Sequence, residues 1–315
     1  MPDAILVSAV VADQHGETLR SIAPDRDLLV VGESMSAEQL AAVEIAYFSA
    51  DCFPDGVTTF MRAAIRAANL AWLHTMSAGV DSPVFRTWID RGVAITTSSG
   101  AAARPIAHTV MLYVLAHARN FDAFRDAQRQ HRWERRANID IEGQSMLVVG
   151  LGPIGIEVAS LATAFGMSVT GLRRTPLPTD PCPSRPLADL PTIVGEFDLV
   201  VSALPLAAET TGIFSAAVIA SMKRGAFFVN VGRGALVDEA ALLDALVNGR
   251  LCGAGLDVFA QEPLPADSPF WDAPNTFITP HNSAAVPSIG RRATEIFLDN
   301  LRRHVAGEPK RNLAS

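Results

Sequence analysis

Short aliphatic runs that alternate with segments of helical periodicity constrain the fold of this chain more than any other feature. The first series of runs covers residues 5–10, 27–32, 43–49, 70–75 and 93–97. A second series starts at Met146-Leu147-Val148-Val149 and continues through 167–172, 198–203, 226–231 and 252–258. Runs of this length are typical of buried strands in parallel sheets, because helices then cover both faces. The pattern predicts an α/β fold with two parallel-sheet domains of the Rossmann-like or flavodoxin-like type.

Two helical segments are predicted to link these sheets. The chain has 315 residues, which is longer than a typical single domain. Residues 100–118 form a long apolar segment that could connect the two series, and residues 286–306 could return the chain to the first one. We therefore predict one domain from residues 1–100, completed by the carboxyl-terminal segment 286–315, and a second domain from residues 101–285.

Charge and cysteine content argue against several classes of function. The net charge of −7 and the pI near 5.5 disfavour a general polyanion binder, so we expect no nucleic-acid partner. Arg104 and His108 interrupt the most apolar long segment, and the amino-terminal residues do not resemble a signal peptide, so we expect neither membrane insertion nor export. Three scattered cysteines fit the reducing cytoplasm better than a disulfide framework or zinc cluster: Cys52, Cys182 and Cys252.

A glycine-rich loop follows the run at 146–149 and opens a segment, 154–165, with helical periodicity. Its sequence, Gly150-Leu151-Gly152-Pro153-Ile154-Gly155, has the GxGxxG spacing. The first glycine permits a tight turn, the second lets the backbone approach a pyrophosphate, and the third allows helix and strand to pack closely. An ordinary glycine turn is the alternative, but the strand and helix around the loop favour dinucleotide binding. The expected contacts are Gly150, Gly152, Pro153, Ile154 and Gly155.

Two arginines follow the next predicted strand, where an NAD site usually presents an acidic side chain to the ribose hydroxyls. The run Val169-Thr170-Gly171-Leu172 leads directly into Arg173 and Arg174. Guanidinium groups can pair with a ribose 2′-phosphate, which favours NADP(H) as cofactor and leaves NAD(H) possible. The alternative is a pair of solvated arginines at a strand end.

Three polar side chains follow predicted strands in the second domain: Arg233, Glu262 and His281. Ligands of open α/β sheets bind at the carboxyl ends of strands. Reduction of a 2-oxo acid needs a cation for the carboxylate, a proton donor for the carbonyl oxygen and a hydride source. A neighbouring carboxylate such as Glu262 would orient the imidazole of His281 and stabilise its protonated form. Each residue alone is more often structural, so the inference depends on the combination.

The order of these motifs resembles the D-isomer-specific 2-hydroxyacid dehydrogenase family over nearly the whole chain. The resemblance rests on the glycine loop and on Val231-Gly232-Arg233-Gly234, Asp257 with Glu262-Pro263, and Thr279-Pro280-His281. It implies that Arg233 holds the substrate carboxylate, that His281 is the general acid or base, and that Glu262 supports the histidine. The arginine pair and the segment Ser77-Ala78-Gly79-Val80-Asp81 are most similar to the glyoxylate and hydroxypyruvate reductase branch, which implies a small 2-oxo acid substrate and a D-2-hydroxy acid product.

The resemblance also implies separate roles for the two domains, with a cofactor and substrate cleft between them. The first domain would bind the substrate and the second the dinucleotide. Ala78 and Gly79 would let backbone N–H groups reach the substrate carboxylate, although a plain strand-ending turn is the alternative reading. Further cofactor contacts would be Leu204, Pro205, Thr210, Val231 and Asp257, the last at the nicotinamide end. His108 stands where the family often has a glutamate, which leaves that local contact open.

The polar stretch 119–138 carries aromatic residues among many arginines, a mixture typical of either a solvated arm or a subunit contact. Together with the resemblance it predicts a homodimer. Phe53, Met76 and Trp133 are candidates either to shape the substrate pocket or to pack. The proline-rich segment 176–186 is expected to be a surface loop without chemistry.

Two other functions are compatible with the same fold. Corepressors that resemble these dehydrogenases sense a dinucleotide and bind protein partners without turnover, although Arg233, Glu262 and His281 together favour an enzyme. A related dehydrogenase that oxidises an inorganic or one-carbon anion would also use an arginine and a histidine. Monitoring NADPH absorbance with several 2-oxo acids separates an enzyme from a sensor.

Overall fold

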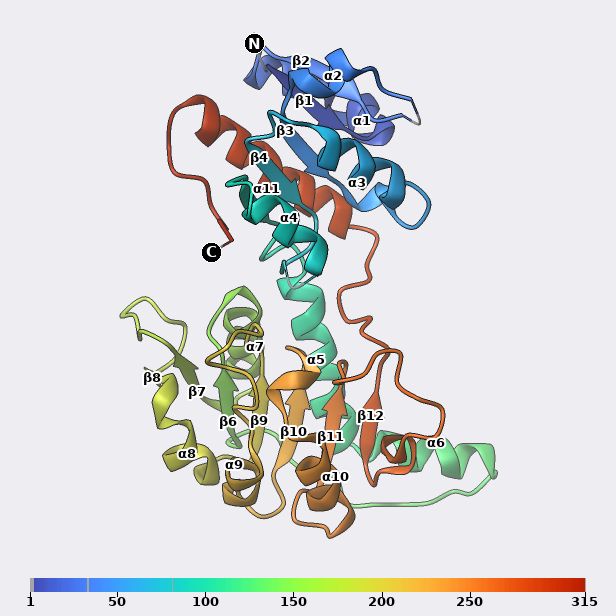
Figure 1. The fold of residues 1–315 in the computed structure, drawn as a ribbon. Helices are drawn as coiled ribbons and strands as arrows, with labels where there is room; N and C mark the ends of the chain where they lie inside the picture. The colour runs from blue at the N-terminus through green and yellow to red at the C-terminus, as the bar shows by residue number, and fades with distance from the viewer. Residues whose placement is uncertain (1–2, 33, 81, 315) are drawn as a thin grey trace. The chain divides into compact units, whose positions relative to one another are not determined.

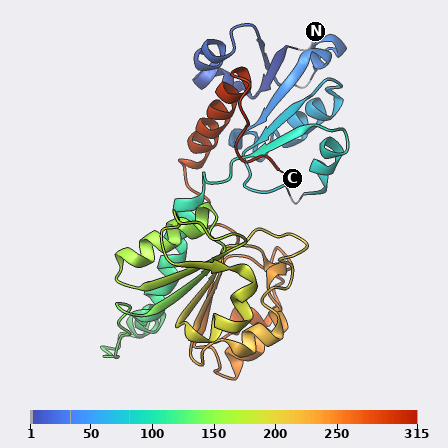
Figure 2. The ribbon, with the colours of Figure 1, turned by 90° about the vertical axis from the view of Figure 1, so that its left-hand side faces the viewer.

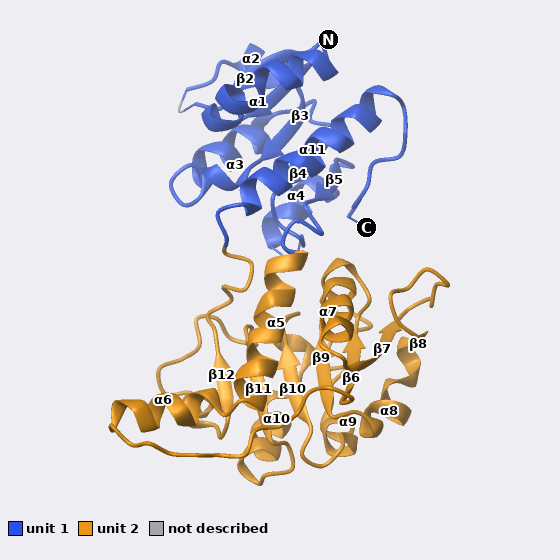
Figure 3. Cartoon of the chain, turned by 180° about the vertical axis from the view of Figure 1, so that it is seen from behind, with its two compact units in different colours: residues 1–102, 286–315 blue, residues 103–285 orange. Residues whose placement is uncertain are grey.

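The computed structural model describes residues 3–32, 34–80 and 82–314. The chain divides into two compact units, unit 1 with residues 1–102 and 286–315 and unit 2 with residues 103–285 (Figure 3). Each unit is built on one sheet in which all paired strands are parallel. The predicted α/β class with two parallel sheets is therefore confirmed.

Unit 1 has a five-stranded sheet in the order β2-β1-β3-β4-β5. Its strands are β1 (Ala4–Val7), β2 (Asp27–Val30), β3 (Val43–Phe48), β4 (Trp72–Thr75) and β5 (Ala94–Thr97). Its α-helices are α1 (Ala9–Ile22), α2 (Ala37–Ala42), α3 (Val57–Arg66), α4 (Arg86–Ile89) and α11 (Ile289–Val305). Successive strand residues face opposite sides of a sheet, so the strands contribute to two apolar layers. Phe297 of α11 packs in one layer and Phe60 of α3 in the other.

The first predicted strand was too long at its carboxyl end. The aliphatic run covers residues 5–10, but β1 ends at Val7 and Ala9 already belongs to α1. The side chain of Ser8 accepts a hydrogen bond of 3.1 Å from the backbone N–H of Val11, so it caps the helix. A local capping interaction thus ended the strand where hydrophobicity alone predicted that it continues.

Unit 2 has a seven-stranded sheet in the order β12-β11-β10-β9-β6-β7-β8. The strands are β6 (Ser145–Val149), β7 (Ser168–Arg173), β8 (Ser184–Pro186), β9 (Leu199–Ser202), β10 (Phe227–Asn230), β11 (Gly253–Leu256) and β12 (Thr276–Ile278). The α-helices are α5 (Ala103–Ala118), α6 (Phe121–Arg129), α7 (Pro153–Ala164), α8 (Leu190–Ile193), α9 (Ala216–Ser221) and α10 (Glu239–Val247). Helices cover both faces of this sheet (Figure 2), and the arrows in Figure 1 run in one direction, so the carboxyl ends of its strands share one edge.

The two outermost strands of unit 2, β8 and β12, were not predicted. Each has only three residues, and none of these residues is fully buried. Asp238 caps α10, because its side chain accepts from the N–H of Ala241 at 3.1 Å, and the helix ends just before Gly249, which has a φ of +69°. No helix within the described residues is long and apolar enough to cross a membrane.

Candidate active site

The glycine loop between β6 and α7 has the backbone geometry that close approach to a phosphate requires. Gly150 has a φ of +107°, and a Cβ at this position would lie 2.8 Å from the carbonyl oxygen of Ala203. A Cβ at Gly155 would lie 1.9 Å from the carbonyl oxygen of Gly150, so the third glycine is required for the loop to pack on the helix. Gly152 differs from both, because nothing lies within 4 Å of its Cβ position. The middle glycine thus leaves open space in front of the amino-terminal end of α7, where Pro153, Ile154 and Gly155 begin the helix.

A cavity of about 380 Å³ lies against this loop. Its lining includes seven of the predicted cofactor-binding residues: Gly150, Gly152, Arg173, Arg174, Leu204, Pro205 and Thr210. The Thr210 hydroxyl donates to the carbonyl oxygen of Pro205 at 2.8 Å and accepts from the N–H of Ala207 at 2.8 Å. Thr210 therefore shapes the segment after β9, and the glycine loop, the end of β7 and this segment line one recess.

Arg173, the last residue of β7, and Arg174, which follows it, each have a carboxylate partner that the sequence analysis did not identify. Arg173 pairs with Asp180 and Arg174 pairs with Glu209. Asp180 belongs to the proline-rich segment 176–186, which we had expected to lack chemistry, and its side chain is only 3% exposed. The hydrogen bond from the Ser184 hydroxyl lowers the pKa of Asp180 most. A hydrogen bond from the backbone N–H of Leu177 and the guanidinium of Arg173 also lower this pKa. For Glu209, the sequence did offer one signal, because this acidic residue directly precedes the predicted cofactor contact Thr210.

His281 and Glu262 are hydrogen-bonded to each other. The Nδ1 atom of His281 lies 2.7 Å from Oε2 of Glu262. The other carboxylate oxygen of Glu262 accepts from the backbone N–H of Phe259 at 3.0 Å, so the carboxylate is held from two sides. His281 adopts a left-handed backbone conformation with a φ of +50°, which is uncommon outside glycine and asparagine. Its side chain is 47% exposed, so the imidazole is accessible while its orientation is set by the glutamate.

Asp257 organises the segment that carries His281. The residue is 1% exposed, and its carboxylate accepts from the backbone N–H of Asn282 at 2.9 Å and from both the N–H and the hydroxyl of Ser283. The Thr279 hydroxyl also donates to Asp257 and is hydrogen-bonded to the hydroxyl of Tyr113. Burial raises the pKa of Tyr113 to about 12. The buried carboxylate therefore fixes the turn after β12, on which His281 stands.

Arg233 lies on the neighbouring turn, after β10. Its guanidinium Nη1 donates to the carbonyl oxygen of Gly232 at 2.8 Å, and its own carbonyl oxygen accepts from the side-chain amide of Asn230 at 3.0 Å. A Cβ at Gly234 would lie 1.9 Å from the carbonyl carbon of Phe259, in the segment that leads from β11 to Glu262. The turns after β10 and β11 thus touch through backbone atoms, which places Arg233, Glu262 and His281 on adjacent turns at the carboxyl ends of β10, β11 and β12. Val231 is buried at the start of the first of these turns.

Ala78 and Gly79 follow β4 in unit 1. The Ser77 hydroxyl donates to the carbonyl oxygen of Gly79 at 2.7 Å, which closes a tight turn and leaves Ala78 exposed. Asp81, the last residue of the predicted substrate loop, lies outside the described residues. His108 is exposed on α5.

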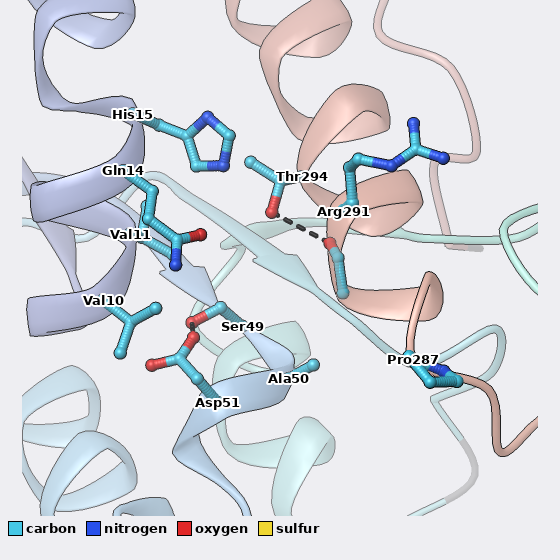
Figure 4. A pocket seen from close by; sticks show the side chains of 11 residues that line it. Val10, Val11, Gln14, His15, Ser49, Ala50, Asp51, Pro287, Arg291 and Thr294 are labelled. Atoms are coloured by element: carbon cyan, nitrogen blue, oxygen red, sulfur yellow. Dashed lines mark hydrogen bonds between the residues drawn. The ribbon is translucent and has the colours of Figure 1, made fainter.

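Unit 1 also contains a cavity of about 330 Å³, formed by α1, the segment after β3 and the start of α11 (Figure 4). Its hydroxyl groups are engaged within the unit, because Ser49 donates to Asp51 at 2.6 Å and Thr294 donates to a backbone carbonyl at 3.0 Å. Arg291 pairs with Glu295 at 2.5 Å. We therefore assign no ligand to this cavity.

Comparisons with known proteins agree with this geometry. Residues 111–283 match the family model described as D-isomer specific 2-hydroxyacid dehydrogenase, NAD binding domain. The chain is 34% identical to glyoxylate/hydroxypyruvate reductase B of Pectobacterium carotovorum over 254 residues, 78% of this chain and 79% of the relative. The same enzyme of Salmonella schwarzengrund is 34% identical over 79% of this chain and 78% of its own length.

Solved structures with the same fold cover the whole chain. A D-isomer specific 2-hydroxyacid dehydrogenase from Xanthobacter autotrophicus, in complex with NADPH and MES, is 33% identical with a TM-score of 0.79, over 100% of this chain and 98% of that one. An NADPH-dependent glyoxylate/hydroxypyruvate reductase from Sinorhizobium meliloti, in complex with NADP and sulfate, is 26% identical with a TM-score of 0.78, over 100% of this chain and 98% of that one.

Fold, site and comparisons together define the class of protein. A parallel sheet with a glycine-rich phosphate loop and a histidine–glutamate pair at one edge is the architecture of an NAD(P)-dependent oxidoreductase. The chain belongs to the D-isomer specific 2-hydroxyacid dehydrogenase family.

Proposed function

We propose that this enzyme uses NADPH to reduce a small 2-oxo acid of the glyoxylate or hydroxypyruvate class to the corresponding D-2-hydroxy acid. The observation that carries the proposal is the 2.7 Å hydrogen bond between His281 Nδ1 and Glu262 Oε2, on the sheet edge that also presents Arg233 and the glycine loop. The names of the relatives from Pectobacterium and Salmonella support the same substrate class.

His281 is the proposed proton donor. A carboxylate can only accept hydrogen bonds, so the pair with Glu262 puts a hydrogen on Nδ1 and directs the other ring nitrogen, Nε2, away from the glutamate. When bound, the reduced nicotinamide supplies the hydride to the carbonyl carbon. His281 then gives its Nε2 proton to the carbonyl oxygen, and Glu262 stabilises the imidazolium before transfer and keeps the ring in place.

Arg233 is the proposed partner of the substrate carboxylate. A guanidinium binds a carboxylate through two parallel hydrogen bonds, which fixes the orientation of the 2-oxo acid as well as its position. The close approach at Gly234 supports this role, because it holds the arginine turn against the glutamate segment. Asp257 has a proposed positioning role, because it is buried and its hydrogen bonds to Asn282 and Ser283 hold the segment that carries His281.

Unit 2 is the proposed dinucleotide-binding domain and unit 1 the proposed substrate domain. The glycine loop and residues 204–210 would hold the pyrophosphate and ribose, with the adenosine 2′-phosphate at Arg173 and Arg174. Val231 and Asp257 would adjoin the nicotinamide. Ala78 and Gly79 would offer backbone N–H groups to the substrate carboxylate.

The proposed assembly is a cytoplasmic homodimer that binds no nucleic acid. The segment 119–138 supports the dimer, because Trp133 is 97% exposed and Phe121, in the same segment, is also exposed. Large exposed aromatic side chains are typical of protein interfaces. Light scattering of the purified protein tests the assembly, and a monomeric mass would contradict it.

The decisive test of the activity follows NADPH absorbance with glyoxylate, hydroxypyruvate, pyruvate and phenylpyruvate. We expect turnover with the smaller acids, a large loss of turnover in His281→Ala and a strong loss of substrate affinity in Arg233→Ala, with NADPH binding largely retained in both. Turnover in either variant equal to that of the unchanged enzyme would reject the role of that residue. Absence of turnover with every 2-oxo acid, despite NADPH binding, would reject the reductase function.

A further inference from the structure

Arg173 and Arg174, at the carboxyl end of β7, are held in different ways. Arg173 donates to Asp180, and the second oxygen of Asp180 accepts from the Ser184 hydroxyl at 2.6 Å and from the N–H of Leu177 at 2.8 Å. The side chain of Asp180 is 3% exposed and that of Arg173 is 26% exposed. Because this hydrogen-bond network holds the Asp180 carboxylate in place against Arg173, Arg173 stays with Asp180.

Arg174, by contrast, can change its partner. It pairs with Glu209, and the two side chains are 83% and 54% exposed. Ion pairs in this setting are weak because water and salt screen them. A ribose 2′-phosphate carries more negative charge than a carboxylate and offers several acceptor oxygens, so it can displace Glu209 from the guanidinium.

Glu209 is also placed to interact with a ribose that has no phosphate. It lines the same cavity as Gly152 and Arg174, and among the described residues of this lining it is the one carboxylate. In most NAD sites a carboxylate at the end of the second strand accepts hydrogen bonds from the ribose hydroxyls. Here β7 ends in Arg173, and the acidic side chain comes from the segment after β9, which the hydroxyl of Thr210 holds in shape.

We propose that Glu209 is a specificity-determining residue that lets one site accept both NADPH and NADH. With NADPH, Arg174 leaves Glu209 for the 2′-phosphate, and the loss of this ion pair weakens NADPH binding. With NADH, Arg174 stays paired and Glu209 accepts hydrogen bonds from the ribose hydroxyls. This inference rests on the proposed use of NADPH and names the residue that limits the preference for it.

The test measures dissociation constants of the full-length enzyme for NADPH and NADH by fluorescence titration without any 2-oxo acid. Glu209→Gln keeps the size of the side chain and removes its charge. Because one charge contact near the surface is altered for each cofactor, we expect NADPH to bind about threefold more tightly and NADH about threefold more weakly, a change of about tenfold in their ratio. Glu196→Gln removes an exposed negative charge elsewhere in unit 2 and serves as the matched control, with an unchanged ratio.

A double variant checks that Glu209 acts on NADPH through Arg174. In an Arg174→Gln background, the Glu209→Gln substitution should no longer improve NADPH binding by more than a small factor, whereas its effect on NADH should persist. Equal changes for both cofactors in Glu209→Gln, or a ratio equal to that of Glu196→Gln, would overturn the proposal. Failure of the reductase function is a separate result, because these titrations need no turnover: a shifted ratio without reduction of any 2-oxo acid would overturn the substrate assignment alone.

Discussion

The two ends of the unit 2 sheet differ in how firmly their functional residues are held in place. At β10, β11 and β12, backbone contact at Gly234 and the buried carboxylate of Asp257 hold the turns that carry Arg233 and His281. At β7, the side chain of Arg174 is 83% exposed and its partner Glu209 lies in solvent as well. One end is fixed by packing and buried hydrogen bonds, and the other by charges at the surface.

This difference follows from what each end has to do. Proton and hydride transfer require donor and acceptor within a few tenths of an ångström of the productive geometry, so the supporting residues must be rigid. Recognition of a phosphate depends on charge and a few hydrogen bonds, and a mobile arginine can supply them. Substitutions at the two ends should therefore differ both in size and in kind of effect.

The largest expected effect is on turnover when His281 is replaced. His281→Asn removes the proton donor but keeps a residue that tolerates the left-handed conformation at this position. We expect kcat to fall by about 10²–10⁴, the range that general acid catalysis contributes, while the dissociation constant for NADPH changes less than about twofold. Stopped-flow or steady-state kinetics with glyoxylate measure kcat, and fluorescence titration measures the dissociation constant for NADPH.

His281→Ala provides the control for backbone effects. Alanine is strained at a φ of +50°, so this variant should lose about 1 kcal/mol more stability than His281→Asn while losing a similar amount of turnover. Retained turnover in the asparagine variant would mean that backbone conformation, and not the imidazole, accounts for the loss in His281→Ala.

Asp257→Asn should lower both stability and activity. The N–H and the hydroxyl of Ser283 now donate hydrogen bonds to the carboxylate, and the NH2 of the new amide group cannot accept them. We therefore expect the free energy of unfolding to fall by about 2–3 kcal/mol. Because the turn that carries His281 is then less fixed, kcat should fall as well. Urea denaturation and steady-state kinetics measure the two effects, with the exposed Asp272→Asn as the control. An unchanged unfolding midpoint would show that the buried carboxylate does not hold the turn.

The third prediction separates the two arginines. Arg174→Gln should weaken NADPH binding about tenfold, the effect of losing one charge-assisted contact of about 1.4 kcal/mol, with little change for NADH or for stability. Arg173→Gln should instead destabilise the protein, because it leaves the buried carboxylate of Asp180 without its cation. Titration with both cofactors and thermal unfolding distinguish the outcomes. A selective loss of NADPH binding in Arg173→Gln alone would reverse the assignment.

The smallest expected effect is that of salt. Raising NaCl from about 0.05 M to about 0.5 M shortens the distance over which exposed charges act, so the dissociation constant for NADPH should rise a few fold. NADH binding should change less because it has no 2′-phosphate. Measurement of kcat at saturating substrates should show almost no salt dependence, since a direct hydrogen bond joins Glu262 to His281 and the backbone N–H of Phe259 also holds the Glu262 carboxylate. Equal salt dependence of both cofactors would argue against a surface phosphate contact.

Much of the fold could be predicted from local pattern. The aliphatic runs located the central strands of both sheets, because buried parallel strands are apolar on both faces. The edge strands β8 and β12 were missed because their residues are partly exposed and only three residues long. The end of β1 was misplaced because Ser8 starts a helix within an aliphatic run.

The sequence by itself determined the order of strands and helices, the glycine loop and the residue types available for chemistry, because each depends on neighbours in the chain. Only the tertiary structure decided which of these residues meet. Glu262 and His281 are 19 residues apart, Arg174 and Glu209 are 35 apart, and Tyr113 reaches Thr279 across 166 residues. The first two pairs form because parallel strands bring their carboxyl ends to one edge, and the third forms because α5 packs against the sheet. No local propensity encodes that arrangement.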